Sequence, residues 1–126
     1  MMEIIVTDEN DLRFIEFCKS FGCDVDDSQV VLLLSNFGKI IGCGSFKVYD
    51  GSSCEITTLF LNSYDNREKI AYKLIRQLEK IAMDYDFQSI VVTFDSRDDI
   101  LVEIFEKLDY HFTDDLLMKK EFRTLI

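Results

Sequence analysis

The feature that most constrains the fold is a change of hydrophobic period between residues 54 and 94. Residues 54–61 are rich in Ile, Thr, Leu and Phe, which is typical of a strand. From Ile70 onwards the apolar residues recur at the spacing of one helical face, which predicts a helix over residues 66–83. Residues 88–94 are again nearly all apolar, as in a strand buried on both faces. A strand, helix and strand in this order imply a right-handed crossover and a locally parallel pair of strands.

The remaining elements are predicted around this unit. In the first helix, Asp8 or Asn10 is the expected N-cap and Gly22 the expected stop. Its inward residues are predicted to be Leu12, Phe14, Ile15, Phe17, Cys18 and Phe21, and those of the last helix Ile100, Leu101, Ile104, Phe105 and Leu108. Further strands are expected at 3–7, 29–34, 40–48, 110–112 and 116–122, and the other helices at about 8–21 and 98–108.

This pattern predicts an α/β fold in the broad sense, which includes α+β. We expect a mixed, mostly antiparallel sheet flanked by helices, in the order β-α-β-β-β-α-β-α-β-β. The length of 126 residues and the 48% hydrophobic content fit one domain, residues 1–126. No low-complexity or proline-rich tract interrupts it.

Charge and hydropathy restrict the environment and the partners. The net charge of −10 and the pI near 4.4 make nonspecific nucleic-acid binding unfavourable. Basic small molecules or basic protein segments fit such a chain better, although the charge can also serve solubility alone. The acidic N-terminus does not resemble a signal peptide, and no apolar run is long enough to span a membrane. We therefore expect a cytoplasmic protein.

Cysteine and histidine offer no metal or redox motif. The four cysteines, Cys18, Cys23, Cys43 and Cys54, contain no CxxC pair, and His111 is the only histidine. We expect no metal site and reduced, structural thiols. Cys54 lacks a histidine-based partner that could activate it as a nucleophile, and His111 is expected at the surface or in a strand.

The start of the 66–83 helix is the strongest candidate site. Backbone amides there can hold a phosphate or another anion. All five glycines lie at or before Gly51, so this turn has none of the glycines that usually allow a phosphate to approach the backbone. Asn66, Arg67, Lys69 and Lys73 instead offer a local cationic patch. An ordinary solvated helix face is the alternative.

Two stretches resemble the GNAT family of acetyl-CoA-dependent N-acyltransferases. The first is Glu55-Ile56-Thr57-Thr58-Leu59-Phe60-Leu61 leading into Asn66-Arg67-Glu68-Lys69-Ile70-Ala71-Tyr72-Lys73-Leu74-Ile75. The second is Ile104-Phe105-Glu106-Lys107-Leu108-Asp109-Tyr110, which is similar to the family's Leu-Tyr-Glu-Lys-Leu-Gly-Phe, followed by a closing strand at 117–122. The resemblance covers nearly the whole chain.

The resemblance implies a coenzyme A site. The family's pyrophosphate loop reads Arg/Gln-x-x-Gly-x-Gly/Ala, and this chain has Asn66-x-x-Lys69-x-Ala71, so only the last small residue fits. The Lys69 side chain implies binding that is weaker, rearranged or absent. Backbone groups of residues 59–61 would line the acyl-thioester arm. The implied cofactor-binding residues are Leu59, Phe60, Leu61, Asn66, Arg67, Glu68, Lys69, Ile70, Ala71, Lys73 and Phe105.

The resemblance also implies catalytic roles. Glu55 matches a glutamate that handles the amine proton, directly or through water; a charged strand end is the alternative. Phe105 stands where the family often has a tyrosine that protonates the thiolate, and Tyr110 or Tyr72 could substitute. Asp24, Asp26 and Asp27 lie where the family often binds the acceptor, so they form either an amine-binding rim or a solvated loop.

The leading interpretation is an N-acetyltransferase that uses acetyl-CoA and acts directly on a primary amine of a small molecule or peptide, preferably a cationic one. The alternative is a GNAT-like binding or regulatory domain with weak or no catalysis. A protein-interaction module or homodimer that uses exposed strand edges is a third possibility.

Overall fold

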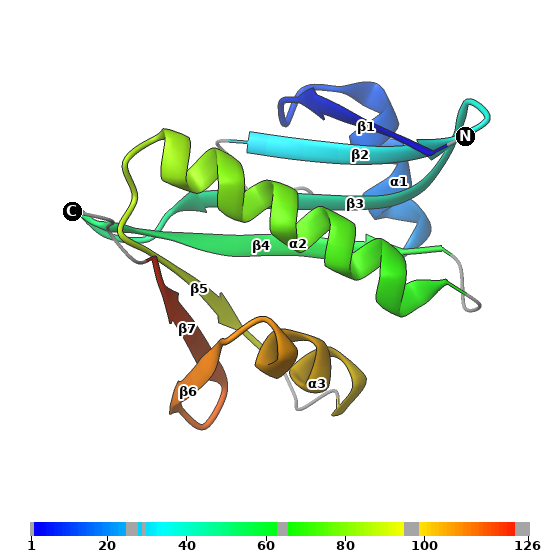
Figure 1. Ribbon diagram of the computed structural model, residues 1–126. Coiled ribbons are helices and arrows are strands. Elements are labelled where there is room, and N and C mark those ends of the chain that lie inside the picture. Colours follow the sequence, from blue (N-terminus) through cyan, green and yellow to red (C-terminus); the bar gives the residue numbers. More distant parts are fainter. Residues whose placement is uncertain (1, 25–27, 29, 63–65, 95–98, 123–126) are drawn as a thin grey trace.

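The computed structural model describes residues 2–24, 28, 30–62, 66–94 and 99–122. Within them seven strands form one sheet, and three helices pack against it (Figure 1). The elements are β1 (Met2–Thr7), α1 (Leu12–Ser20), β2 (Val30–Asn36), β3 (Lys39–Val48), β4 (Ser53–Leu61), α2 (Arg67–Asp84), β5 (Ser89–Thr93), α3 (Asp99–Lys107), β6 (His111–Asp114) and β7 (Leu117–Glu121). This order confirms the prediction.

The sheet is mixed, with the strand order β1-β2-β3-β4-β5-β7-β6. Every neighbouring pair is antiparallel except β4 and β5, which are parallel. The predicted parallel pair is therefore confirmed, and α2 is the helix that connects its two strands.

β4 consists of two segments with different neighbours. Residues Ser53 to Ile56, the closed segment, pair with β5 on one side and β3 on the other. Residues Thr57 to Leu61, the open segment, continue along β3 but have no partner among the described residues of β5. Figure 1 shows β4 and β5 diverging towards the end at which α2 begins.

A β-bulge marks the boundary between the two segments. Ser45 of β3 pairs with Thr58, whereas the next residue, Phe46, pairs with Ile56, so Thr57 is the extra residue. A bulge bends its strand and increases the local twist. The bulge therefore lies at the position where β4 leaves β5.

The two faces of the sheet carry separate cores. The larger core joins the sheet to α2 and α3, and the smaller one joins it to α1. Phe14, Phe17 and Cys18 of α1 pack on Val31 and Leu33 of β2. None of the described helices has the length and hydropathy needed to cross a bilayer.

Glycines in β3 allow α2 to approach the sheet closely. A Cβ on Gly42 would lie 3.1 Å from Ile70 Cγ2 and 3.3 Å from Leu74 Cδ1. Such distances are shorter than ordinary contact, so a larger residue would push the helix away. Gly42 pairs with Leu61, the last residue of β4. This contact brings the first turns of α2 next to the open segment.

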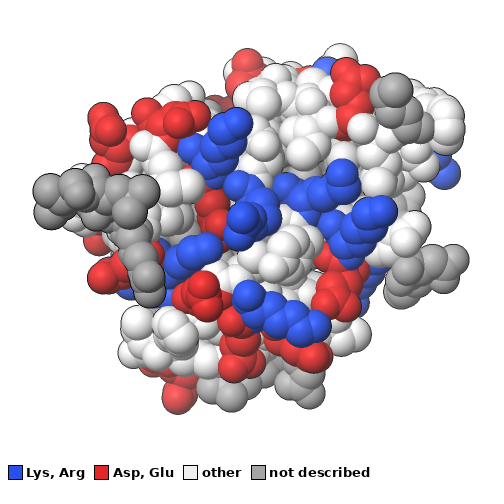
Figure 2. Space-filling view, viewed as in Figure 1, with Lys and Arg blue, Asp and Glu red and all other residues white. Residues whose placement is uncertain are grey.

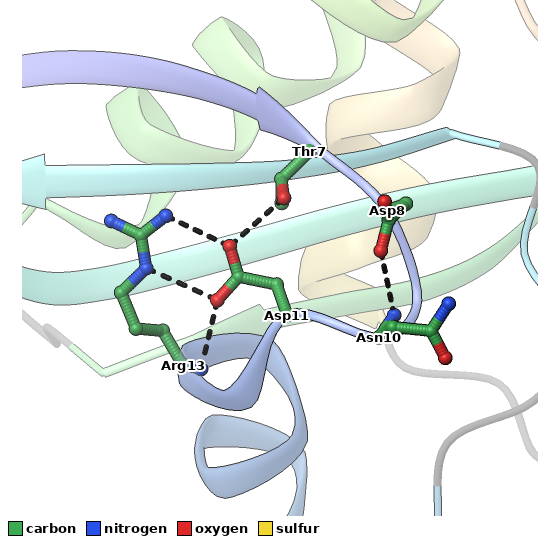
Figure 3. Close-up of polar contacts among 5 residues, drawn as sticks. All are labelled: Thr7, Asp8, Asn10, Asp11 and Arg13. Carbon is green, nitrogen blue, oxygen red and sulfur yellow. Dashed lines mark hydrogen bonds and ion pairs between the residues drawn. The ribbon is translucent and has the colours of Figure 1, made fainter.

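The N-cap of α1 differs from the prediction. Asp11 caps the helix, because its Oδ1 accepts a hydrogen bond of 2.9 Å from Arg13 N (Figure 3). The side chain of Arg13 also donates to Asp11, and Thr7 Oγ1 donates to Asp11 Oδ2. Asp8 instead accepts from Asn10 N in the preceding turn, so the prediction of Asp8 or Asn10 was wrong. These bonds, with those from Arg13 foremost, hold the pKa of Asp11 well below its usual range.

Three predicted inward residues are exposed. Leu12, at the start of α1, is 72% exposed, and Phe21 lies beyond the end of that helix and is partly exposed. Ile100, in the first turn of α3, is 52% exposed, whereas Val102 is buried. Helix ends extend past the surface that their central turns cover, so apolar spacing alone overestimates the buried face there.

Candidate functional site

Glu55, the candidate base, lies at the end of the closed segment. Cys54 and Ile56 on either side belong to the core beneath α2, so Glu55 points to the opposite face, which carries α1. Its carboxylate is half-buried, and Thr93 Oγ1 donates a 2.9 Å hydrogen bond to Glu55 Oε2. Thr93 is the last residue of β5, so this bond joins β4 to β5 close to where their pairing ends.

The open segment combines unpaired backbone with hydroxyl groups. Alternate peptide groups of residues 57–61 point away from β3 and have no strand partner among the described residues. The hydroxyl of Thr57 lies 2.8 Å from that of Ser45 and 3.3 Å from that of Ser28. Leu59 and Leu61 face the core beneath α2, whereas Phe60 faces α1 and stacks on Phe21 at 4.8 Å. Residues 59–61 therefore offer backbone hydrogen-bonding groups along an edge.

The start of α2 lies beside this edge. Asn66 is its N-cap, but its side chain makes no capping hydrogen bond to the described residues. The first turn of the helix is closed by Ile70 N, which donates to Asn66 O at 2.9 Å. Amides in the first turn of a helix have no intrahelical acceptor and point outwards. Lys69 and Lys73 are exposed, while Ile70 and Ala71 are buried under the helix.

An ion pair between α2 and α3 closes one side of this helix start. Lys107 Nζ donates to Glu68 Oε1 at 2.8 Å, and this hydrogen bond raises the pKa of the Lys107 ammonium. Both side chains are more than half exposed, so the pair contributes little stability. The pair places a further cation, Lys107, near the helix start, and this neighbour is not evident from the sequence.

Phe105 and Tyr110 lie within the core rather than beside Glu55. Both are buried, with ring centroids 4.9 Å apart. The Tyr110 hydroxyl has no hydrogen-bond partner among the described residues, and burial, with the nearby Glu79 carboxylate, raises its pKa well above the usual value. Because Tyr110 belongs to the core beneath α2, it does not share a face of the sheet with Glu55.

The other singled-out residues are spread around the molecule. Tyr72 and His111 are exposed, on α2 and β6. Cys54 is buried, and burial raises the pKa of its thiol to about 12, which disfavours the reactive thiolate. All four cysteines are free. Asp24 is exposed, whereas Asp26 and Asp27 lie outside the described residues. No group of potential metal ligands gathers in the part of the chain that the structure describes.

A groove follows the outer face of α2 towards β7. Its lining includes Asn66, Lys69, Lys73, Arg76 and Lys120. Glu55 is not part of it. The groove therefore lies on the α2 face, and the candidate base lies on the α1 face.

The comparisons with known proteins identify the family and the fold. The profile of the acetyltransferase (GNAT) family matches residues 3–110. The sequence has no sufficiently similar relative among curated proteins.

Solved structures with the same fold are numerous. The PaiA N-acetyltransferase from Thermoplasma acidophilum in complex with coenzyme A superposes with a TM-score of 0.77 at 16% identity, covering 97% of this chain and 99% of that one. The aminoglycoside 6'-N-acetyltransferase from Enterococcus faecium gives 0.74 at 16% identity, covering 94% and 96%. A GNAT family acetyltransferase from Elizabethkingia anophelis with acetyl-CoA bound gives 0.74 at 13% identity, covering 96% and 98%.

The structural matches establish the fold, and the family profile covers most of the sequence, including β4, α2 and α3. This chain therefore belongs to the GNAT family of acetyltransferases.

Proposed function

We propose that this protein transfers an acetyl group from acetyl-CoA to a primary amine, with the thioester held along the open segment of β4. The observation that carries this proposal is the edge of residues 57–61 beside the start of α2, which has no strand partner within the described parts of the chain. The edge can pair with the amide groups of an extended arm, and outward-pointing amides can hold its phosphates. Coenzyme A has both parts.

The phosphates would meet a site that relies on cations rather than glycines. Asn66 and the amides of the first turn of α2 would hold the pyrophosphate, with charge from Lys69, Lys73 and the nearby Lys107. The exposed side chain of Lys69 occupies the position of the family's glycine, so the phosphate would be held farther from the backbone. Glu68 repels a phosphate, but its ion pair with Lys107 offsets part of that repulsion.

Glu55 would remove a proton from the attacking amine, directly or through water. The new bond joins the amine nitrogen to the acetyl carbon, and the bond from that carbon to sulfur breaks. Thr93 holds one carboxylate oxygen of Glu55 and leaves the other able to accept the proton. The thiol released has a pKa of about 8.5 and can leave as a thiolate, so a general acid is helpful rather than essential. Tyr110 is too deeply buried to supply one by its present placement.

The amine would approach from the α1 face, on which Glu55 lies. That face also carries Glu9, whose Oε2 accepts a 3.1 Å hydrogen bond from Ser28 N, and Asp24 is exposed in the segment that follows α1. Several carboxylates near the acceptor side favour a cationic amine. The acidic net charge of −10 would increase the local concentration of such an acceptor.

A binding or regulatory domain is the second candidate function. It is favoured by Lys69 in the place of a loop glycine and by Phe105, which is buried and has no hydroxyl to protonate a thiolate. Such a protein would bind acetyl-CoA but transfer its acetyl group slowly or not at all.

One pair of measurements separates these functions. Acetyl-CoA at millimolar concentration should raise the melting temperature, because a ligand that binds the native state stabilises it. Thiol release over a panel of primary amines should then exceed hydrolysis without amine. Stabilisation without amine-dependent release would support the regulatory function. If acetyl-CoA causes neither stabilisation nor amine-dependent thiol release, both functions are contradicted.

A further inference from the structure

The outer face of α2 carries a stripe of four exposed cations. Their positions differ by four, three and four residues, which places them in one row along the helix. None of the four forms an ion pair among the described residues, whereas Lys107, Lys119 and Lys120 all do. The stripe consists of Lys69, Lys73, Arg76 and Lys80.

This stripe is unusual for a chain with a net charge of −10. Figure 2 shows Lys and Arg side chains gathered at the centre of the face that α2 covers, with many of the acidic side chains towards the edges. All four residues line the groove along α2. Unpaired cations in one row repel one another, so the arrangement favours an anionic partner that lies along the helix.

The stripe is longer than the pyrophosphate of coenzyme A requires. With a rise of 1.5 Å per residue, Arg76 lies about 10 Å and Lys80 about 16 Å along the helix from Lys69. Phosphates at the start of α2 can meet Lys69 and Lys73. Coenzyme A also carries a 3'-phosphate, which Arg76 can meet, so the far end of the stripe at Lys80 is left for a second group of negative charges.

The position of the stripe indicates which substrate such a partner would bring. The stripe begins at the helix start that faces the open segment, whereas Glu55 lies on the opposite face of the sheet. A partner along α2 would therefore deliver the thioester and leave the α1 face to the amine. A nucleic acid would extend beyond the stripe and meet the acidic remainder of the surface.

We propose that the stripe docks an acidic protein that carries its acyl group as a thioester on a 4'-phosphopantetheine arm. This inference rests on the proposed function, because it adds a second donor to the same site. A phosphopantetheine arm is joined to its protein by one phosphodiester and has no pyrophosphate. The helix start then holds a single phosphate, for which the Lys69 ammonium can replace the close backbone approach that a glycine allows.

The chemical step has the same balance as with coenzyme A. The bond from the acyl carbon to the arm's sulfur breaks, the bond from that carbon to the amine nitrogen forms, and the amine proton passes to Glu55. The carrier protein leaves with a free thiol or thiolate, and no further reactant is needed.

A bacterial acyl carrier protein in its acetylated holo form is a suitable probe. Its binding to the wild-type chain should be measured by calorimetry at about 0.15 M salt, where charges more than about 8 Å apart are largely screened, and should weaken as salt is raised further. In the double variant Arg76→Glu with Lys80→Glu, the dissociation constant should rise about tenfold or more, because like charges then face each other. Acetyl-CoA affinity should fall by no more than about threefold, because only its 3'-phosphate comes near these positions and the pyrophosphate stays at the helix start.

The control is Lys19→Glu with Lys39→Glu, which makes the same change of net charge at exposed positions outside α2. It should leave carrier affinity within about twofold of wild type. The milder Arg76→Gln with Lys80→Gln replaces the first variant if melting shows a folding defect.

Three results would overturn the proposal while leaving the acetyl-CoA function intact: no carrier binding by a chain that binds acetyl-CoA, equal losses in the stripe and control variants, or equal losses for both donors. Failure of both donors with the wild-type chain would contradict the proposed function itself.

Discussion

The closed and open segments of β4 belong to one strand but perform different tasks. The closed segment, Ser53 to Ile56, pairs on both sides, and three of its four residues are buried. The open segment, Thr57 to Leu61, pairs with β3 alone as far as the structure describes the chain, and most of its residues are half-buried. The difference indicates that the first segment holds the sheet together and that the second leaves backbone groups available for a ligand. Glu55 lies close to the boundary.

Replacing Glu55 should have the largest effect on activity. In Glu55→Gln the side chain keeps its size but cannot take the amine proton, so kcat/KM for acetyl transfer should fall by about 10²- to 10⁴-fold. Steady-state thiol release measures this, with melting temperature as the control for folding. A loss below about threefold would remove Glu55 from the proposed mechanism.

Truncating one apolar side chain in each segment should reduce the unfolding free energy of the protein by different amounts. Ile56→Ala removes a buried side chain from the closed segment and should cost about 3 kcal/mol of unfolding free energy. Leu59→Ala removes a half-buried side chain from the open segment and should cost about half as much. Urea unfolding of both variants provides the comparison. Equal costs would mean that the open segment is as important to the core as the closed one.

Substitutions of Lys69 test whether the start of α2, beside the open segment, binds acetyl-CoA. Lys69→Glu should weaken acetyl-CoA binding about tenfold, because it replaces a cation near the phosphates with an anion. Lys69→Gly should strengthen binding if close backbone approach is worth more than the charge. Calorimetry with acetyl-CoA measures both variants, and unchanged affinity in both would contradict the assigned loop.

Replacing Tyr110 should have the smallest effect on stability and on acetyl transfer. Its hydroxyl is buried and makes no hydrogen bond to any described residue, so Tyr110→Phe should leave stability unchanged or raise it by up to about 1 kcal/mol. Acetyl transfer should stay within about twofold of wild type, because the hydroxyl lies in the core on the other side of the sheet from Glu55. A large loss of kcat at unchanged KM would restore Tyr110 as a general acid.

The elements with strong periodicity could be predicted from the sequence, and the features that depend on distant contacts could not. The apolar face of α2 and the largely apolar β5 sufficed to predict the parallel pair. The bulge at Thr57 leaves no trace in Ile56-Thr57-Thr58-Leu59, which looks like an ordinary strand. The bond from Thr93 to Glu55 and the Lys107–Glu68 pair join residues 38 and 39 positions apart. Only the folded chain brings such residues together.

The proposed donor site requires that the glycine-free loop before α2 binds the phosphates of acetyl-CoA. Its residues were found from the sequence because a strand runs into a helix there, and the structure places beside it a strand edge that lacks a partner among the residues it describes. The roles of Asn66, Lys69 and Lys73 stay predictions until a ligand is located.

The most direct test follows the backbone amides of the ¹⁵N-labelled protein by NMR while acetyl-CoA is added. We predict saturable shifts at residues 57–61 and 66–73, with smaller changes in the closed segment. No shifts at millimolar acetyl-CoA, or shifts confined to other elements such as α1 or β6, would contradict the assignment of the open segment as the donor site.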